Sequence, residues 1–131
     1  MHPPSPRVIW FIAVGCAAAL THLGVVMALV SRFGLAPLVA NIIGWLVAFC
    51  VSFGGHYSAT FRDQNAPKLR AAMRFFVISA AGFAINECAY AVLLHWNWLP
   101  YDVALAVILL AVASITYLLS RHWAFRGTEA R

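Results

Sequence analysis

Residues 75–94 read FFVISAAGFAINECAYAVLL, an unbroken apolar run in which Glu87 is the one formally charged residue. At about 1.5 Å of rise per residue, a helix of this length covers the roughly 30 Å hydrocarbon core of a bilayer. Three further runs have the same character, at residues 8–30, 38–57 and 103–120. Because backbone amides find no water partner in lipid, each run is predicted to be an α-helix. We therefore predict an all-α membrane protein with four transmembrane helices.

The composition of the whole chain excludes a water-soluble globule. Of its 131 residues, 63% are hydrophobic and 10% are charged, against about 45–50% and 25% in soluble domains. We predict a single transmembrane domain over residues 1–131, and no removable signal peptide because the first run is too long. The cysteines are odd in number and lie inside apolar runs, so neither a disulfide framework nor a metal site is expected. They are Cys16, Cys50 and Cys88.

The basic residues indicate the orientation of the helices. Arg32 lies in an outer connection, whereas the other eight Lys and Arg residues precede the first run, separate the second from the third, or follow the fourth. By the positive-inside rule, both termini and the central loop are predicted to be cytoplasmic. The outer connections, at residues 31–37 and 95–102, are short and close two helical hairpins.

The two hairpins resemble each other in sequence. A shift of 64 residues places Phe11 on Phe75 and His22 on Asn86, and it places Phe61-Arg62 on Phe125-Arg126. A two-span unit begins and ends on the same side of the membrane, so such a duplication is parallel. We therefore expect two hairpins that run in the same direction.

Several short motifs together resemble the GtrA-like family across essentially the whole chain. They are the Phe/Gly-containing segment Trp10–Gly15, Pro37–Asn41, Arg74-Phe75-Phe76 and Ser120–Arg126. The resemblance implies a small bacterial inner-membrane protein that helps move polyprenyl-phosphate-linked sugars across the membrane, for glycosylation of cell-envelope polysaccharides. One position departs from the family pattern: Ala59 stands where the second half has Trp123, and the family usually has an aromatic residue there too.

Glu87 is the most informative polar residue. An ionised carboxylate in the middle of a bilayer costs about 2.5 kcal/mol or more, so it faces a cavity or a partner, or it stays protonated. His22 and Asn86 lie at a similar depth, and with Asn41 and Glu87 they form a candidate path for a sugar headgroup. The alternative is that these groups only join helices, at roughly 0.6 kcal/mol for each hydrogen bond.

The predicted helix over residues 38–57 carries a stripe of small residues that we interpret as a packing face, at an internal or dimer interface. The stripe comprises Asn41, Gly44, Ala48, Ser52 and Gly55.

The predicted inner surface combines arginines with aromatic residues, which positive-inside topology and an aromatic belt already explain. The sharper hypothesis is that the arginines bind a lipid phosphate bidentately. The candidates are Arg62, Arg74, Arg121 and Arg126, with Phe61, Trp123 and Phe125 as interface aromatics.

The sequence shows no catalytic set and no cofactor or metal motif, so an enzyme is not expected, and topology explains the basic residues without nucleic acid. The leading hypothesis is translocation of polyprenyl-phosphate-linked monosaccharide, with that lipid and the membrane lipids as partners. A homodimer is expected, because four helices enclose little room. One alternative is a non-transporting anchor of a glycosyltransferase. Another is a small multidrug exporter, although exporters carry their glutamate in the first helix.

Overall fold

The structure, a computed structural model, describes residues 6–60 and 68–124. Every element in these residues is helical, which confirms the predicted all-α class. One helix continues directly into a π-helical turn. The elements are α1 (Pro6–Phe33), α2 (Pro37–Gly55), the π-helix η1 (His56–Thr60), α3 (Lys68–Trp96) and α4 (Tyr101–Ala124).

Each predicted apolar run lies within one of these helices. Three segments of the described chain are long and apolar enough to cross a membrane: Val8–Phe33, Pro37–Ala59 and Ala72–Trp96. Helix α4 has 24 residues, which corresponds to about 36 Å. Its apolar part among the described side chains is Tyr101–Ile115, and the remainder of the fourth predicted run lies outside them. The protein is thus a small helical membrane protein.

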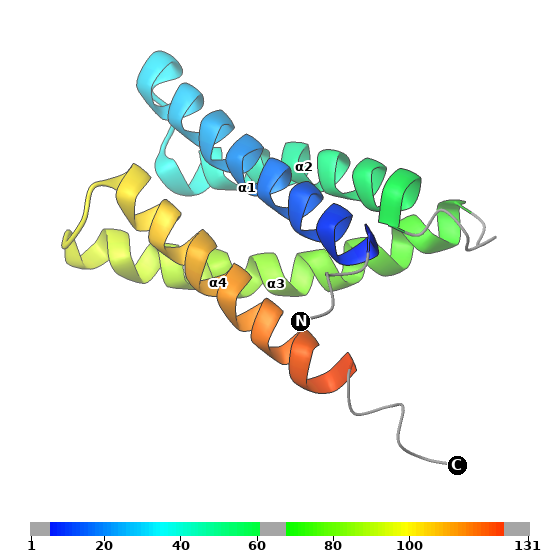
Figure 1. The fold of residues 1–131 in the computed structure, drawn as a ribbon. Helices are drawn as coiled ribbons and strands as arrows, with labels where there is room; N and C mark the ends of the chain where they lie inside the picture. Colours follow the sequence, from blue (N-terminus) through cyan, green and yellow to red (C-terminus); the bar gives the residue numbers. More distant parts are fainter. Residues whose placement is uncertain (1–5, 61–67, 125–131) are drawn as a thin grey trace, which may run out of the picture.

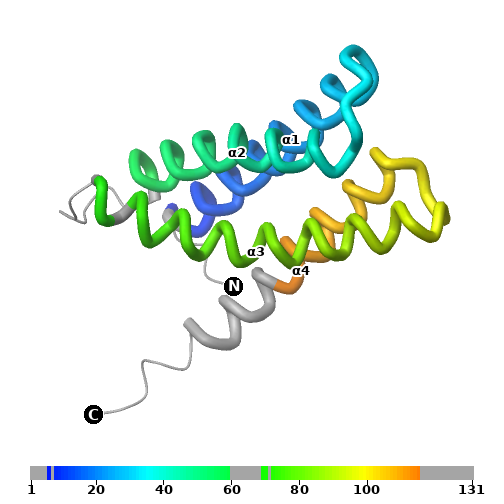
Figure 2. The backbone as a smooth tube through the Cα atoms, turned by 180° about the vertical axis from the view of Figure 1, so that it is seen from behind, coloured from blue at the N-terminus to red at the C-terminus, as the bar shows by residue number. Residues whose placement is uncertain are grey.

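The turns that close the two hairpins lie at the same end of the molecule, on the left of Figure 1 and on the right in the opposite view of Figure 2. The beginnings of α1 and α3 lie at the other end. Both hairpins therefore run in the same direction, as predicted. Which end faces the cytoplasm stays a prediction.

The first turn follows from two residues. Gly34 has a φ of 65°, a left-handed conformation that glycine adopts without steric cost. Its N–H donates to the carbonyl of Val30 at 3.1 Å, which caps the end of α1. Pro37 then begins α2, where its fixed φ suits a helix and its missing N–H costs nothing.

The second turn uses asparagine in place of glycine. Asn97 has a φ of 52°, and its N–H donates to the carbonyl of Leu94 at 3.2 Å. Helix α4 begins after Pro100, with Asp102 in its first turn. An acidic side chain there interacts favourably with the positive end of the helix dipole. Both turns are shorter than predicted, because the helices continue past the apolar runs.

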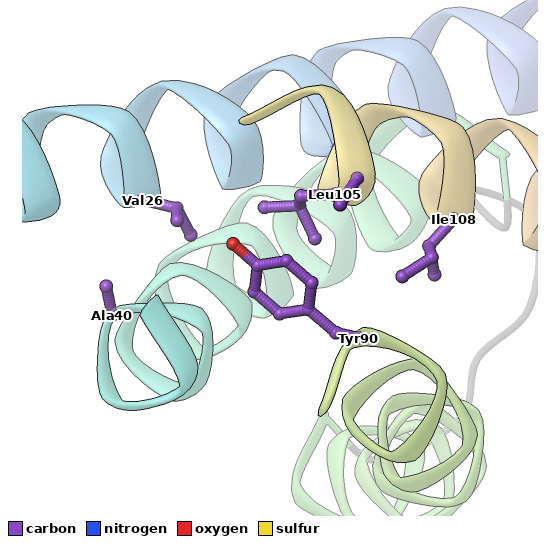
Figure 3. Close-up of a cluster of buried hydrophobic side chains, with 6 residues drawn as sticks. Val26, Ala40, Tyr90, Leu105 and Ile108 are labelled. Atoms are coloured by element: carbon purple, nitrogen blue, oxygen red, sulfur yellow. The ribbon is translucent and has the colours of Figure 1, made fainter. Parts of the chain in front are cut away.

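The core of the bundle lies in the half nearer the two turns and draws on all four helices (Figure 3). Its largest side chain is Tyr90, which is fully buried and donates its hydroxyl hydrogen to the carbonyl of Tyr101 at 2.9 Å. A buried Tyr hydroxyl usually has such a partner. The core comprises Val26, Ala40, Tyr90, Ala104, Leu105 and Ile108.

The outward faces of the helices are apolar. Leu20, Ile78 and Leu110 are about 70% exposed, and similar side chains cover every helix. Soluble monomers rarely expose continuous apolar surface on this scale. These faces therefore contact lipid, and the polar side chains turned away from them define the interior of the bundle.

Candidate functional site

Four polar side chains from three helices meet in the interior of the bundle, and we call them the polar cluster: His22, Asn41, Asn86 and Glu87. His22 Nε2 lies 2.7 Å from Asn41 Oδ1. Asn41 Nδ2 donates to Asn86 Oδ1 at 2.9 Å and to Glu87 Oε2 at 2.5 Å. The structure thus brings together all four residues that the sequence analysis placed on the candidate headgroup path.

The carboxamide of Asn41 is the centre of the polar cluster and sets the direction of its hydrogen bonds. Its NH₂ group donates to two acceptors on α3, and its oxygen is left to accept from His22. An imidazole nitrogen can donate only if it carries a hydrogen. With the carboxamide in this orientation, the Nε2–H tautomer of His22 completes the contact, and the donors point in order from α1 through α2 to α3.

Burial differs between the members of the polar cluster. Asn41 is completely buried, and His22 and Asn86 retain 5% and 4% exposure, whereas Glu87 is only partly buried. The hydrogen bonds among the described residues leave the second Glu87 oxygen and the Asn86 amide nitrogen unused. No fully buried side-chain nitrogen or oxygen in the described part of the chain lacks a partner. Both unused atoms therefore keep some exposure, as one acceptor and one donor on consecutive residues of α3.

The small residues of α2 allow α1 to approach closely enough for the His22–Asn41 bond. A Cβ atom on Gly44 would lie 2.8 Å from His22 Cδ2 and 2.8 Å from Val26 Cγ2. A Cβ atom on Gly55 would lie 2.7 Å from a methyl group of Val14. Both contacts are shorter than van der Waals distance, so only glycine fits. The predicted packing face of α2 is therefore an internal face that contacts α1.

The sequence repeat is visible in the polar cluster. His22 and Asn86 occupy equivalent positions of the two hairpins, and both hydrogen bond to Asn41. Pro37 and Pro100 align the second helices of the two hairpins, so the equivalent of Asn41 is Ala104. Ala104 is completely buried and has no polar group. Only the first hairpin supplies the central carboxamide, and the polar cluster is not duplicated within the described chain.

An aromatic pair that the sequence analysis missed lies beside the polar cluster. The Trp45 ring stacks on Phe83 with centroids 4.6 Å apart and an interplanar angle of 11°. Trp45 Nε1 donates to Ser79 Oγ at 2.9 Å, and the Phe83 ring lies 6.5 Å from His22. The sequence did contain an indication of this pair, because Trp45 follows Asn41 by four residues and Phe83 precedes Glu87 by four. Such spacings place side chains on one helix face.

The half of the bundle away from the two turns contains one more buried polar residue among those described. His56 is 6% exposed. Its ring centroid lies 5.0 Å from Phe11 and 5.8 Å from Phe75, which are the first pair of repeat-related residues. Repeat-related residues of α1 and α3 thus contact α2 and its π-helical continuation at two levels. His22 and Asn86 contact Asn41, and Phe11 and Phe75 contact His56.

The predicted phosphate-binding group falls largely outside the described part of the chain. The Arg74 side chain is described and is exposed near the beginning of α3. Arg121 and Trp123 belong to α4, but their side chains are not among those described. Arg62, Arg126, Phe61 and Phe125 lie outside the described residues. Phosphate binding by these arginines therefore stays a prediction.

The fold and the polar cluster together define the class: a small all-α membrane protein with four polar side chains that meet in its interior. The chain belongs to the family of the GtrA/DPMS transmembrane domain, whose model matches residues 10–125. The resemblance seen in the short motifs is thereby confirmed. Proteins of this family handle polyprenyl-phosphate-linked sugars and are generally non-catalytic membrane proteins. No curated protein and no solved structure matches the chain.

Proposed function

We propose that this protein translocates polyprenyl-phosphate-linked monosaccharides across the bacterial inner membrane, for glycosylation of cell-envelope polysaccharides. Membership of the GtrA/DPMS family supports polyprenyl-phosphate-linked sugars as the class of lipid. Chemistry on the sugar belongs to other proteins in this proposal. What the protein supplies is a polar contact inside the bilayer for a headgroup that lipid cannot solvate.

The observation that carries the proposal is the pair of unused polar atoms on α3. A sugar hydroxyl both donates and accepts hydrogen bonds. The free oxygen of Glu87 is an acceptor and the free amide nitrogen of Asn86 is a donor, and both keep some exposure at the edge of a buried network. Polar groups at this depth are costly and commonly mark the paths of substrates. The hydroxyl groups of a sugar can donate to the first atom and accept from the second.

The remaining parts of the lipid have separate places in the proposal. The phosphate is held near the inner face by the arginines named above, of which Arg74 is exposed. Arginine suits phosphate because its planar guanidinium donates two parallel hydrogen bonds. The prenyl chain stays in the bilayer, along the apolar outer faces of the helices.

Headgroup translocation in proteoliposomes tests the proposal. The probe is a short-chain polyprenyl-phosphate-glucose placed in one leaflet, and the measurement is the rate at which its headgroup reaches the other. We expect movement with wild type, and a rate at least about tenfold lower with Asn41→Leu, since this variant removes all three bonds that hold the cluster.

Ser114→Ala is the matched control. Ser114 is exposed and bonds only to the carbonyl of Leu110 in its own helix, so its loss removes a membrane-embedded hydroxyl away from the polar cluster. We expect the control to retain the wild-type rate. No movement above protein-free liposomes with the wild type, together with stable association with a glycosyltransferase, would contradict translocation and favour the anchor alternative.

A further inference from the structure

We infer that the chain has one headgroup path, and that it runs along the interface of α2 with α3, where aromatic rings contact the apolar face of the sugar. This inference rests on the proposed translocation function. It adds to that function the pair of helices between which the sugar passes and the side chains that it contacts there. Glu87 enters only as a hydrogen-bonding group, which a carboxyl group is in either protonation state.

A row of aromatic rings fills the interface of α2 with α3, where the two helices run side by side (Figure 2). The row begins beside the polar cluster with the stacked rings of Trp45 and Phe83 and continues away from the two turns. The Trp45 ring also lies 5.5 Å from Phe76, whose centroid is 5.3 Å from that of Phe49. We call this row the aromatic seam, and it comprises Trp45, Phe49, Phe53, Phe75, Phe76 and Phe83.

Every ring of the aromatic seam keeps part of its surface exposed. Phe76 is 42% exposed, and the other rings are partly buried. The face of an aromatic ring carries partial negative charge, so it attracts the C–H groups that cover one face of a pyranose. The aromatic seam therefore offers contacts to the part of a sugar that forms no hydrogen bonds.

Hydrogen-bonding groups alternate with rings on the α3 side of the aromatic seam. Ser79, Phe83 and Glu87 follow one another at intervals of four residues, so one helix face presents a hydroxyl, a ring and a carboxyl group about 6 Å apart along the axis. Ser114 donates its hydroxyl hydrogen to a carbonyl of its own helix. Ser79 instead accepts from Trp45, and within the described chain its own hydrogen is not donated. A sugar beside Phe83 thus has a hydroxyl donor on one side and a carboxyl group on the other.

The repeat supplies an internal comparison, because the interface of α1 with α4 is the equivalent of that of α2 with α3. The three α3 residues just named correspond to residues of α1 without polar groups in their side chains: Gly15, Ala19 and Leu23. Asn41 and Trp45 correspond to Ala104 and Ile108 of α4, which belong to the hydrophobic core. Apolar packing is therefore enough to join the equivalent helices. The alternating rings and polar groups of the aromatic seam occur at one of these two interfaces, which is why we assign one path to the chain.

Benzophenone crosslinking from two repeat-equivalent positions tests this path. Phe76→p-benzoylphenylalanine places the photoreactive group in the aromatic seam, and Ile12→p-benzoylphenylalanine places it at the equivalent position of α1. Phe76 and Ile12 are 42% and 48% exposed, so the two positions are matched in their access to lipid, and neither substitution replaces a buried side chain.

The probe is a short-chain polyprenyl-phosphate-glucose in proteoliposomes. Mass spectrometry of each adduct shows whether the sugar or the prenyl chain has reacted. We expect adducts on the sugar from position 76, and adducts on the prenyl chain alone from position 12. The translocation rate of wild type is measured with the same lipid.

The outcomes separate this inference from the proposed function. Sugar adducts from position 12 as well, or none from position 76, would overturn the inference, and translocation by wild type would leave the proposed function standing. No translocation by wild type would overturn the proposed function, and this inference with it.

Discussion

Replacing Gly44 by alanine probes the close approach of α1 and α2 that the polar cluster requires. The added Cβ would lie 2.8 Å from His22 Cδ2, 2.8 Å from Val26 Cγ2 and 3.1 Å from the His22 carbonyl oxygen. The imidazole ring and the β-branched valine have few alternative rotamers, and the carbonyl belongs to the backbone of α1. The helices therefore have to move apart, and the His22–Asn41 bond lengthens.

The magnitude follows from a comparison with Gly24→Ala. Gly24 lies within α1, and a Cβ there would meet nothing within 4 Å. Both substitutions gain about 1 kcal/mol of helix propensity, which cancels in the comparison. Overpacking at Gly44 costs about 1–3 kcal/mol, and the weakened interhelical hydrogen bond adds about 0.6 kcal/mol. Gly44→Ala should therefore be about 2–3 kcal/mol less stable than Gly24→Ala.

The assay is SDS-induced unfolding in mixed micelles, followed by circular dichroism, which gives the free energy of unfolding of each variant. Gly44→Ala should also translocate more slowly than Gly24→Ala, because the Asn41 carboxamide loses its anchor on α1. Equal stability of the two variants, or a more stable Gly44→Ala, would refute the internal packing of α2 against α1.

Three further predictions concern the polar cluster, its aromatic neighbour and the topology. A double-mutant cycle of His22→Leu and Asn41→Leu should give a coupling free energy of about 0.6 kcal/mol; zero coupling in SDS unfolding would mean that the 2.7 Å contact contributes nothing. Trp45→Phe keeps a ring against Phe83 but loses the donor to Ser79, so it should cost about 0.6 kcal/mol by the same measurement, whereas Trp45→Ala should cost about 3 kcal/mol or more. A cysteine introduced at Leu35, in the turn between α1 and α2, should react from outside intact cells with a membrane-impermeant maleimide in a variant without the native cysteines. Labelling only after the cells are opened would reverse the predicted orientation.

Much of the fold could be predicted from the sequence because lipid imposes strict conditions on a chain. An apolar run of about 20 residues has to be helical to satisfy its backbone, so the four helices followed from hydropathy. The π-helical turn His56–Thr60 was not foreseen. Hydropathy reports which residues are apolar, and it does not distinguish an i→i+4 from an i→i+5 hydrogen bond.

The depth of the site was predictable, but its contacts were not. His22 and Asn86 were placed at one level by the repeat, and Glu87 by its position beside Asn86. The sequence does not give the rotation of each helix about its axis, because apolar residues surround these helices on most sides and amphipathic patterning is weak. The central role of Asn41, between α1 and α3, therefore became apparent only in the structure.

Trp45 and Phe83 show a second limit of prediction from the sequence. Aromatic residues are common in membrane helices, so composition alone gave no reason to separate these two from the other rings. Their ring stacking depends on the distance and angle between α2 and α3. The four-residue spacings to Asn41 and Glu87 become informative only once those two polar residues are known to meet.

The most direct test of the central claim, that the sugar headgroup passes the polar cluster, is photo-crosslinking in proteoliposomes. The probe is a short-chain polyprenyl-phosphate-sugar with a diazirine on the sugar, and the labelled peptides are mapped by mass spectrometry. We predict labelling near Trp45 on α2 and between Phe83 and Glu87 on α3, lost on competition with unlabelled lipid-sugar and strongly reduced in Asn41→Leu. Labels confined to the helix ends, or labels that excess unlabelled lipid does not remove, would contradict the account.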